Sequence, residues 1–343
     1  METKTSLLGS SLAVAVPFVQ ELAKKPLINI PPRYVRPDQD PAPLPSLNSS
    51  SSSQIPVIDM QKLLSHDFMD SELQKLHHAC KEWGFFQLIN HEVSSWLVEK
   101  FKSEIEDFFK LPLEEKNKYS QLPGDIEGYG HNFVVSEEQK LDWGDIETLE
   151  AYSAELKILS MKILKLMAKG LRIEENEMAV LVEEEWQSMR MNYYPPCPQP
   201  ELVVGLCPHS DGSGITILLQ VSEVEGLQIR KDGMWISVKP LPNAFIINVG
   251  DSLEILSNGT YRSVEHRATV NSLKERLSVA TFCSPRLDGE IGPAPSLITP
   301  ETPAMFRRIR VEEFYKGRFS RKLDRKSYLD TIRIQNEGGG IKQ

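Results

Sequence analysis

Apolar positions divide the chain into a first part with mixed helix and strand patterns and a second part rich in short β-runs. The first part predicts two strands and three helices, at residues 55–59, 71–83, 85–90, 94–110 and 148–168, with Gly84 ending the first of these helices. From Ser188 onward, short apolar runs alternate with turn residues, which is typical of an antiparallel barrel or sandwich.

The second part contains six further strands by the same reasoning, at residues 214–221, 226–230, 235–238, 244–249, 260–266 and 276–282. Residues tolerant of positive φ at 231–233 and at Asn258-Gly259 predict turns between them. The charged stretch 311–334 is expected to be helical toward its end.

The N-terminal residues are predicted to add little to the core. Residues 7–18 suggest a mature N-terminal helix, although Ala13-Val14-Ala15 also resembles a signal-peptide cleavage site. Residues 31–54 combine six prolines with the run Ser49 to Ser53, which predicts a tether without a packed structure. No apolar run approaches the length that spans a membrane.

Charge and cysteine content argue against several classes of partner and of structural site. The 343 residues include 39 lysines and arginines against 48 acidic residues, a formal charge of −9, so nucleic acid and anionic membranes are not expected partners. The four cysteines form no C-x-x-C pair, which argues against a disulfide framework or a structural zinc site. We therefore expect a cytoplasmic monomer.

A candidate metal site begins with His209-Ser210-Asp211. In extended backbone the imidazole and the carboxylate, two residues apart, project to the same side and can share one metal ion. The triplet alone is weak, because a histidine bonded to a turn aspartate gives the same pattern. His266, at the end of a predicted strand, completes a two-histidine, one-carboxylate set that suits Fe(II) and leaves coordination positions open.

Arg276 begins a predicted strand on which Ser278, Ala280 and Phe282 share its face, while Leu277 and Val279 take the other. A core-facing arginine needs a carboxylate partner, and a guanidinium binds one through two parallel hydrogen bonds. A dicarboxylate co-substrate would supply that partner, and an internal salt bridge to a protein acid is the alternative.

Asn192 and Tyr194 again share a strand face, immediately before the proline-rich stretch 195–200. The Tyr194 hydroxyl is suited to donate a hydrogen bond to a bound carboxylate. An ordinary aromatic core residue is an equally good interpretation of this position.

These residues together resemble the plant 2-oxoglutarate-dependent dioxygenases, through His209-x-Asp211, His266, Arg276-x-Ser278 and Asn192-x-Tyr194-Pro195. The resemblance extends to the N-terminal stretches 55–59 and 83–91. Further stretches, at 31–36, 243–245, 250–251 and 257–259, are similar to the branch with the senescence-related protein and the codeine and thebaine O-demethylases.

The resemblance implies a fold that is mainly β with flanking α-helices: a distorted double-stranded β-helix of jelly-roll type with an α/β N-terminal region. It divides the chain into an N-terminal helix and tether (1–54), an N-terminal dioxygenase region (55–150), a long helix and connector (151–187), the jelly-roll core (188–290) and a C-terminal helical extension (291–343).

By the same resemblance, His209, Asp211 and His266 become Fe(II) ligands. Arg276 and Ser278 would hold the distal carboxylate of 2-oxoglutarate, with Tyr194 assisting and Asn192 near its chelating end. O2 is the oxidant, ascorbate a supporting reductant, and the substrate a small flavonoid- or alkaloid-like molecule that is hydroxylated, desaturated or O-demethylated. No side chain beyond the metal ligands is expected to be catalytic.

Two alternatives stay open. An oxidase of the same fold uses another reductant, and a silent relative binds iron and 2-oxoglutarate without efficient oxidation. Two departures from the family pattern keep the second open. Glu92 stands where the family usually has glycine, and Asp145 runs directly into Ile146 where the family normally inserts a few dozen residues that border the substrate cavity.

Overall fold

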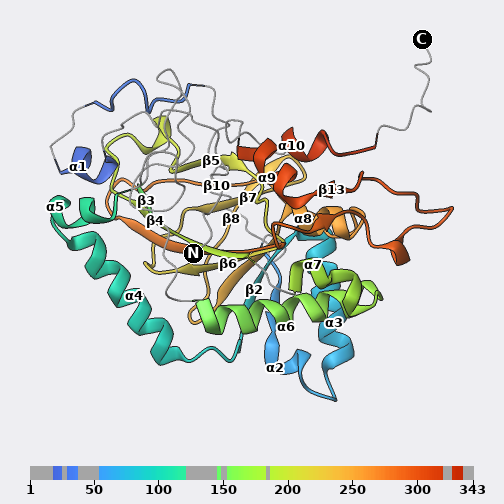
Figure 1. Ribbon diagram of the computed structural model, residues 1–343. Helices are drawn as coiled ribbons and strands as arrows, with labels where there is room; N and C mark the ends of the chain where they lie inside the picture. The colour runs from blue at the N-terminus through green and yellow to red at the C-terminus, as the bar shows by residue number, and fades with distance from the viewer. Residues whose placement is uncertain are drawn as a thin grey trace, which may run out of the picture.

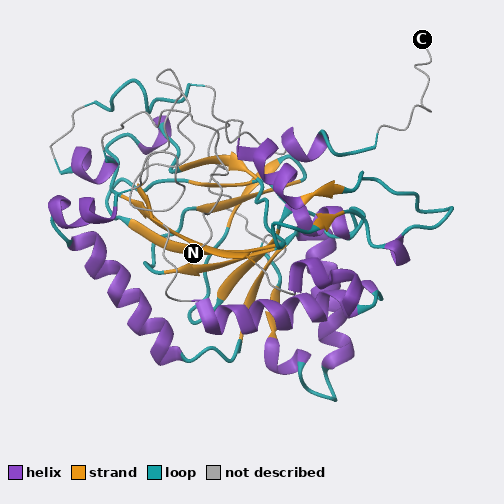
Figure 2. Ribbon diagram, viewed as in Figure 1, coloured by secondary structure: helices purple, strands orange, loops and turns teal. Residues whose placement is uncertain are grey.

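The computed structural model describes residues 18–24, 29–37, 54–120, 145–147, 153–182, 186–319 and 327–334. The predicted helix at 7–18 lies outside these residues except for Phe18, and so does most of the predicted tether. The strands gather at the centre of the molecule and the helices surround them, as Figures 1 and 2 show.

A seven-stranded sheet forms the larger layer, in the order β1-β2-β9-β6-β11-β4-β3. All neighbours are antiparallel except β1 and β2. Its strands are β1 (Val57–Asp59), β2 (Phe85–Ile89), β3 (Asp145–Glu147), β4 (Trp186–Tyr194), β6 (Ile215–Gln220), β9 (Phe245–Val249) and β11 (Arg276–Ser284).

The smaller, four-stranded sheet has the antiparallel order β5-β10-β7-β8. Its strands are β5 (Leu206–His209), β7 (Leu227–Lys231), β8 (Met234–Ser237) and β10 (His266–Ala268). Apolar side chains from both sheets, among them Phe85, Leu218, Ile229 and Ile246, form one buried cluster. The two sheets therefore face each other, as the jelly-roll expectation requires.

The other face of the larger sheet is covered by helices α3 (Met69–His78), α4 (Ser95–Lys110) and α6 (Ser153–Leu171). Alternation along β11 separates the two faces, since Leu277 and Val279 join this helical core while Arg276, Ser278 and Ala280 face the cavity between the sheets. Figure 1 shows α4 and α6 along one side of the strands.

The predicted helix at 71–83 is confirmed as α3 followed by a π-helical turn, Ala79–Trp83, and it ends at Gly84 with φ 61°. The predicted helix at 148–168 corresponds to α6, and residues 148–152 lie outside the described part of the chain. The remaining described helices are α1 (Val19–Ala23), α2 (Met60–Leu63), α5 (Leu113–Lys116), α7 (Ala179–Val182), α8 (Asp251–Leu256), α9 (Val311–Phe319) and α10 (Ser327–Asp330). A two-stranded sheet, β12 (Glu290–Ile291) and β13 (Ile309–Arg310), precedes α9.

The predicted strand at 260–266 is wrong except at its last residue, because β10 runs from His266 to Ala268. The backbone N–H groups of Tyr261 and Ser263 donate to the Ser257 hydroxyl at 3.1 Å and the Glu254 carboxylate at 2.7 Å. Side chains from the end of α8 therefore accept hydrogen bonds from the backbone N–H groups of this segment, which a neighbouring strand would otherwise accept.

The first part of the predicted tether is also packed against the protein body. Tyr34 is buried in an apolar cluster with Val19, Ile30 and Val203, and the Arg36 N–H donates to the Leu202 carbonyl at 2.9 Å. Proline content alone predicted a loose segment here because it does not report the apolar side chains interspersed among the prolines.

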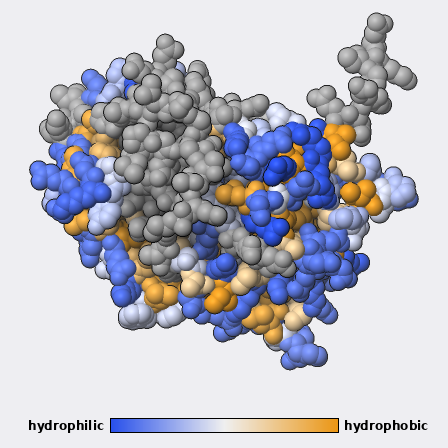
Figure 3. Space-filling view, viewed as in Figure 1, coloured by the Kyte–Doolittle hydropathy of each residue, from blue (hydrophilic) through white to orange (hydrophobic). Residues whose placement is uncertain are grey.

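The coloured part of the face seen in Figure 3 is mostly hydrophilic, with separate hydrophobic patches. Large exposed apolar residues such as Trp96 on α4 and Leu273 on a loop belong to distant segments of the chain. No helix in the described ranges is long and apolar enough to cross a membrane.

Candidate active site

The two predicted histidines meet because strands β5 and β10 pair, which places His266 opposite His209. The Asp211 Oδ1 atom, just beyond β5, lies 3.6 Å from His209 Nε2 and 3.7 Å from His266 Nε2. One ligand atom from each side chain lies within 4.8 Å of the other two. We call this group the metal end of the cavity, since its geometry suits one metal ion with an open face.

Backbone carbonyls orient both imidazoles. His209 Nδ1 is 2.7 Å from the Cys207 carbonyl and His266 Nδ1 is 3.1 Å from the Val264 carbonyl. Each carbonyl accepts a hydrogen bond from Nδ1–H, so the proton of the neutral imidazole stays on Nδ1 and Nε2 keeps a free lone pair. The edge of Phe85, with its ring centroid 5.3 Å from that of His266, supports the second ring.

The outer oxygen of Asp211 is held by two donors that sequence reasoning missed. Thr216 Oγ1 donates to Asp211 Oδ2 at 2.6 Å and Asn248 Nδ2 donates to the same oxygen at 2.8 Å. The two donors lie opposite each other on β6 and β9. A signal was present, since each is a polar residue inside an otherwise apolar strand, where a buried polar group needs a partner.

The protonation states favour metal binding. Burial lowers the pKa of His209 to about 3, and His266 acts in the same direction. Burial alone would raise the pKa of Asp211, but His266, His209 and the hydrogen bonds from Thr216 and Asn248 hold that pKa below its ordinary value. Neutral imidazole and ionised carboxylate are the forms that bind metals.

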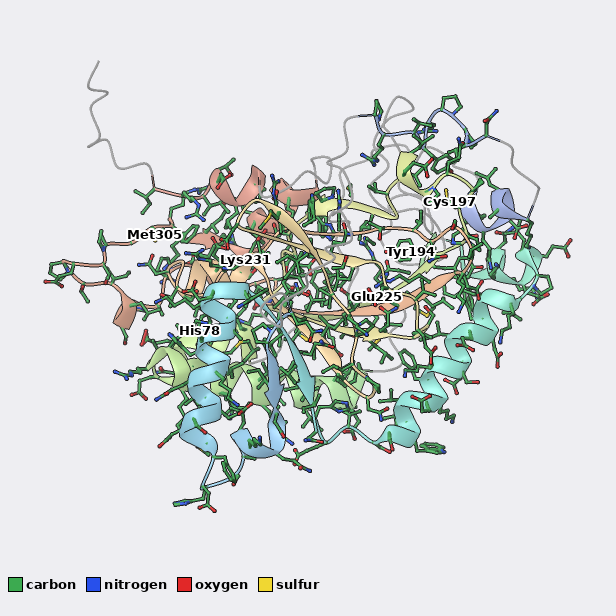
Figure 4. The ribbon with its side chains drawn as sticks, turned by 180° about the vertical axis from the view of Figure 1, so that it is seen from behind. His78, Tyr194, Cys197, Glu225, Lys231 and Met305 are labelled. Atoms are coloured by element: carbon green, nitrogen blue, oxygen red, sulfur yellow. The ribbon has the colours of Figure 1, made fainter. Side chains whose placement is uncertain are left out.

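The other predicted residues form a second group through the pairing of β4 with β11, which sets Tyr194 opposite Arg276 and Asn192 opposite Ser278. We call this group of four the arginine end of the cavity. All four side chains line the same cavity as the metal end. Figure 4 shows Tyr194 among the strands, away from His78 and Met305 at the far side of the molecule.

Arg276 is buried, and the described part of the chain offers its guanidinium no carboxylate. Its Nη1 donates to Ser278 Oγ at 3.3 Å, its Nη2 donates to Gln220 Oε1 at 3.0 Å, and its Nε has no hydrogen-bond partner. Burial lowers the pKa of Arg276, with Tyr194 opposing that shift, but a guanidinium stays charged at neutral pH. The internal salt bridge considered from the sequence is therefore not what the structure shows.

The cavity as a whole is electropositive. Three arginines, Arg190, Arg267 and Arg276, line it, and among the lining residues that the structure describes Asp211 is the single acidic side chain. Asn192 Oδ1 is buried there without a hydrogen-bond partner. The cavity thus combines a metal-binding group with unfilled hydrogen-bonding capacity and excess positive charge, which suits a dicarboxylate.

Comparisons with known proteins agree with this chemistry. The 2OG-Fe(II) oxygenase superfamily matches residues 185–285, and the non-haem dioxygenase in morphine synthesis N-terminal family matches residues 55–161. Similar proteins include oxoglutarate-dependent flavonoid 7-O-demethylase 1 of Ocimum basilicum, 54% identical over 97% of this chain and 94% of the relative. Codeine O-demethylase of Papaver somniferum is 51% identical over 97% of this chain and all of the relative.

This chain belongs to the 2-oxoglutarate- and Fe(II)-dependent oxygenases. The fold agrees with that of JOX2, solved in complex with 2OG, Fe and JA, at a TM-score of 0.85 and 34% identity over 94% of this chain and 99% of that one. The family resemblance and the jelly-roll expectation are confirmed. The oxygenase is an enzyme that uses Fe(II) and 2-oxoglutarate to oxidise a small molecule of plant specialised metabolism.

The oxygenase nevertheless lacks residues that these relatives have. The alignments to the two demethylases run over 358 and 362 residues, whereas this chain has 343. Each relative therefore carries residues with no counterpart here. The predicted deletion at Asp145-Ile146 stays a prediction, because the side chains of β3 and the residues on either side of it lie outside the described part of the chain.

Proposed function

We propose that this oxygenase removes an O-methyl group from an aromatic specialised metabolite of the flavonoid or alkaloid class. Fe(II) would be bound by His209, Asp211 and His266, and 2-oxoglutarate would lie between these ligands and Arg276. The observation that carries the binding roles is the buried Arg276 guanidinium, which shares a cavity with the ligand cluster and whose Nε has no hydrogen-bond partner.

The arginine end would select the co-substrate through its distal carboxylate. Arg276 would form two parallel hydrogen bonds to that group, with Ser278 and Tyr194 adding one each, while Asn192 would contact the chelating end. Gln220, which sequence reasoning missed, orients the guanidinium, and two backbone carbonyls, of Ser222 and Val224, hold the Gln220 amide at 2.9 and 2.7 Å. Its signal was a polar residue that closes a mainly apolar strand.

Bound iron supplies the oxidising power, and the protein's own groups supply position and charge. The overall reaction balances as aryl methyl ether plus 2-oxoglutarate plus O2, giving phenol, formaldehyde, succinate and CO2. One oxygen atom enters succinate, and the other converts the methyl ether to an unstable hemiacetal that releases formaldehyde. O-demethylation is favoured over hydroxylation or desaturation because two relatives at 54% and 51% identity are O-demethylases.

The test is to incubate purified protein with Fe(II), 2-oxoglutarate, ascorbate and panels of methoxyflavones and methoxylated alkaloids. Equal amounts of formaldehyde and succinate, absent with His266→Ala, would support the proposal. Succinate with a hydroxylated or desaturated product and no formaldehyde would reject O-demethylation while keeping the oxygenase activity.

A silent or impaired oxygenase is the second candidate, and the length difference favours it. If the missing residues lie between Asp145 and Ile146, they would interrupt β3, whose neighbour β4 carries the cavity residues Asn192 and Tyr194. The loss would then remove substrate-side wall and leave both ends of the cavity intact.

Inserting the corresponding segment of a demethylase relative between Asp145 and Ile146 separates the candidates. We expect the native chain to bind Fe(II) and 2-oxoglutarate but to form succinate with little product, and the repaired chain to couple the two. A native chain that already yields one product per succinate as tightly as the repaired chain would exclude impairment.

A further inference from the structure

The loop that carries Asp211, residues 210–213, is held from outside the cavity by the C-terminal helix α9. Arg318, in the last turn of α9, donates through Nη2 to the Ser210 carbonyl, and its Nη1 lies 2.8 Å from Asp251 Oδ2 at the start of α8. Ser210 Oγ donates to the same Asp251 oxygen at 3.1 Å. Arg318 therefore ties the loop's backbone and a buried carboxylate together.

A second contact comes from one turn earlier on α9. The Tyr315 hydroxyl donates to the Gly212 carbonyl at 3.2 Å, and Ser252 Oγ donates to it at 2.6 Å. The Asp251 N–H donates to the Asp211 carbonyl at 2.7 Å. The carbonyls of three successive loop residues, 210 to 212, are thus fixed by α8 and α9, and the side chains of His209 and Asp211 project from a backbone that these bonds hold.

The fit around Gly212 is close. A Cβ atom at this position would lie 2.9 Å from Arg318 Cδ and 3.0 Å from Arg318 Nε. The arginine stem therefore occupies the space that any larger residue at 212 would need. Such contact means that a shift of α9 is transmitted to the loop by packing as well as by hydrogen bonds.

Burial makes the Arg318 contact energetically important. Asp251 is 0% exposed, and Arg318, whose side chain is 14% exposed, is its salt-bridge partner. Removing one member of such a pair leaves a buried charge uncompensated. α9 itself is anchored to α8 by a separate apolar core that includes Ile255, Phe314 and Leu329 of α10. Figure 1 shows α8, α9 and α10 together at one end of the molecule.

We propose that Arg318 and Tyr315 are positioning residues for the metal centre, so that the C-terminal helix sets iron affinity without touching the metal or lining the cavity. This inference rests on the proposed ligand set. Outer partners that orient metal ligands typically change metal affinity about 10–100-fold when they are lost. Because Arg318 acts on the backbone and not on a ligand atom, we expect the lower end of that range.

The test measures metal affinity by anaerobic calorimetry with Fe(II), and with Co(II) as a redox-stable probe, at a temperature where each metal-free variant is folded. Arg318→Ala should weaken both metals about tenfold. Lys316→Ala is the matched control, because Lys316 lies on the same helix but is exposed and pairs with Glu312. It should bind metal like the wild type. Tyr315→Phe, which deletes only the hydroxyl, should weaken binding by a smaller factor and tests the proposal if Arg318→Ala does not fold.

The outcomes separate three explanations. If Arg318→Ala is folded and binds metal like the wild type, with only its melting temperature lowered, Arg318 has a merely structural role and the inference is overturned. If Arg318→Ala does not fold, wild-type metal affinity in Tyr315→Phe would overturn the inference instead. His266→Ala, measured in parallel, tests the ligand set itself. If His266→Ala keeps wild-type affinity, the ligand assignment fails; if it loses the metal while Arg318→Ala does not, only the positioning role fails.

Discussion

The two ends of the cavity differ in how completely their polar atoms are satisfied. At the metal end, both histidine Nδ1 atoms and the outer oxygen of Asp211 have hydrogen-bond partners, which leaves three lone-pair atoms facing one point. At the arginine end, Arg276 Nε and Asn192 Oδ1 are buried without partners.

The metal end thus has its supporting hydrogen bonds in place without a ligand, whereas the arginine end has polar atoms that still lack partners. A metal ligand set gains affinity when everything except the donor atoms is fixed in advance. Buried polar atoms without partners, by contrast, are costly unless a ligand satisfies them. The metal end is therefore organised before binding, whereas under the proposed function the co-substrate would complete the arginine end.

The largest effect should come from removing a ligand at the metal end. His266→Ala should lower Fe(II) affinity by more than the roughly 10–100-fold that losing an outer partner costs. The weak visible charge-transfer band of the anaerobic Fe(II) and 2-oxoglutarate complex should disappear. Unchanged affinity in His266→Ala and in the corresponding His209 and Asp211 variants would refute the ligand assignment.

At the arginine end, Arg276→Lys should weaken 2-oxoglutarate binding and leave metal affinity near wild type. An ammonium cannot reproduce the planar fork of a guanidinium. Truncating one partner of a desolvated charge pair costs about 2–5 kcal/mol, and because lysine keeps the charge we expect the lower end of that range, a factor of about 30. Calorimetry with each ligand alone measures how far the 2-oxoglutarate affinity and the metal affinity change separately. Equal 2-oxoglutarate affinity in both proteins would mean that the carboxylate binds elsewhere.

A smaller effect is expected from the donors behind Asp211. Thr216→Val keeps the side-chain shape but removes the hydroxyl that donates to Asp211 Oδ2. Metal affinity should fall about tenfold, with 2-oxoglutarate affinity changed less. Thr216→Ser, which keeps the hydroxyl, is the matched control. If the valine and serine variants bind metal equally, the metal end does not depend on this outer hydrogen bond.

Residue pattern predicted which side chains line both ends better than it predicted the contacts that support them. The pairing of His209 with Asp211 and the cavity-facing side of β11 follow from a two-residue period, because a strand fixes which side chains share a face. Asn248 and Gln220 were not identified, since their partners Asp211 and Arg276 lie 37 and 56 residues away in the chain. Thr216 was not identified although Asp211 is only five residues away, because periodicity does not show which side chains bond to one another. The side-chain bonds that replace a strand at 260–265 span only four and nine residues, but a pattern of apolar positions does not show which backbone groups a side chain will bond.

The two departures from the family pattern had different outcomes. The glycine that the family usually places at 92 implied a positive φ, and Glu92 has φ 65°. The strain expected of a glutamate at a position with positive φ therefore applies here. The predicted deletion depends on how distant residues complete a cavity wall, which pattern alone cannot establish.

The smallest predicted effect concerns stability away from both ends. Glu92 adopts a left-handed conformation that costs a non-glycine residue about 1 kcal/mol or more, and its ion pair with Lys162 at 2.7 Å is between exposed side chains and contributes little. Glu92→Gly should therefore raise the free energy of unfolding by about 1 kcal/mol and the melting temperature by about 2 °C.

Glu92→Ala is the matched control. It removes the same ion pair but keeps a Cβ atom at positive φ, so it should give no such gain in stability. Thermal unfolding of both variants, alongside metal and 2-oxoglutarate titrations, shows whether the free energy of unfolding changes while the affinities for metal and 2-oxoglutarate stay the same. If the glycine variant is no more stable than the alanine variant, the left-handed backbone at 92 carries no strain. If its metal or 2-oxoglutarate affinity changes with its stability, the cavity is coupled to this loop, and the division into two locally determined ends is wrong.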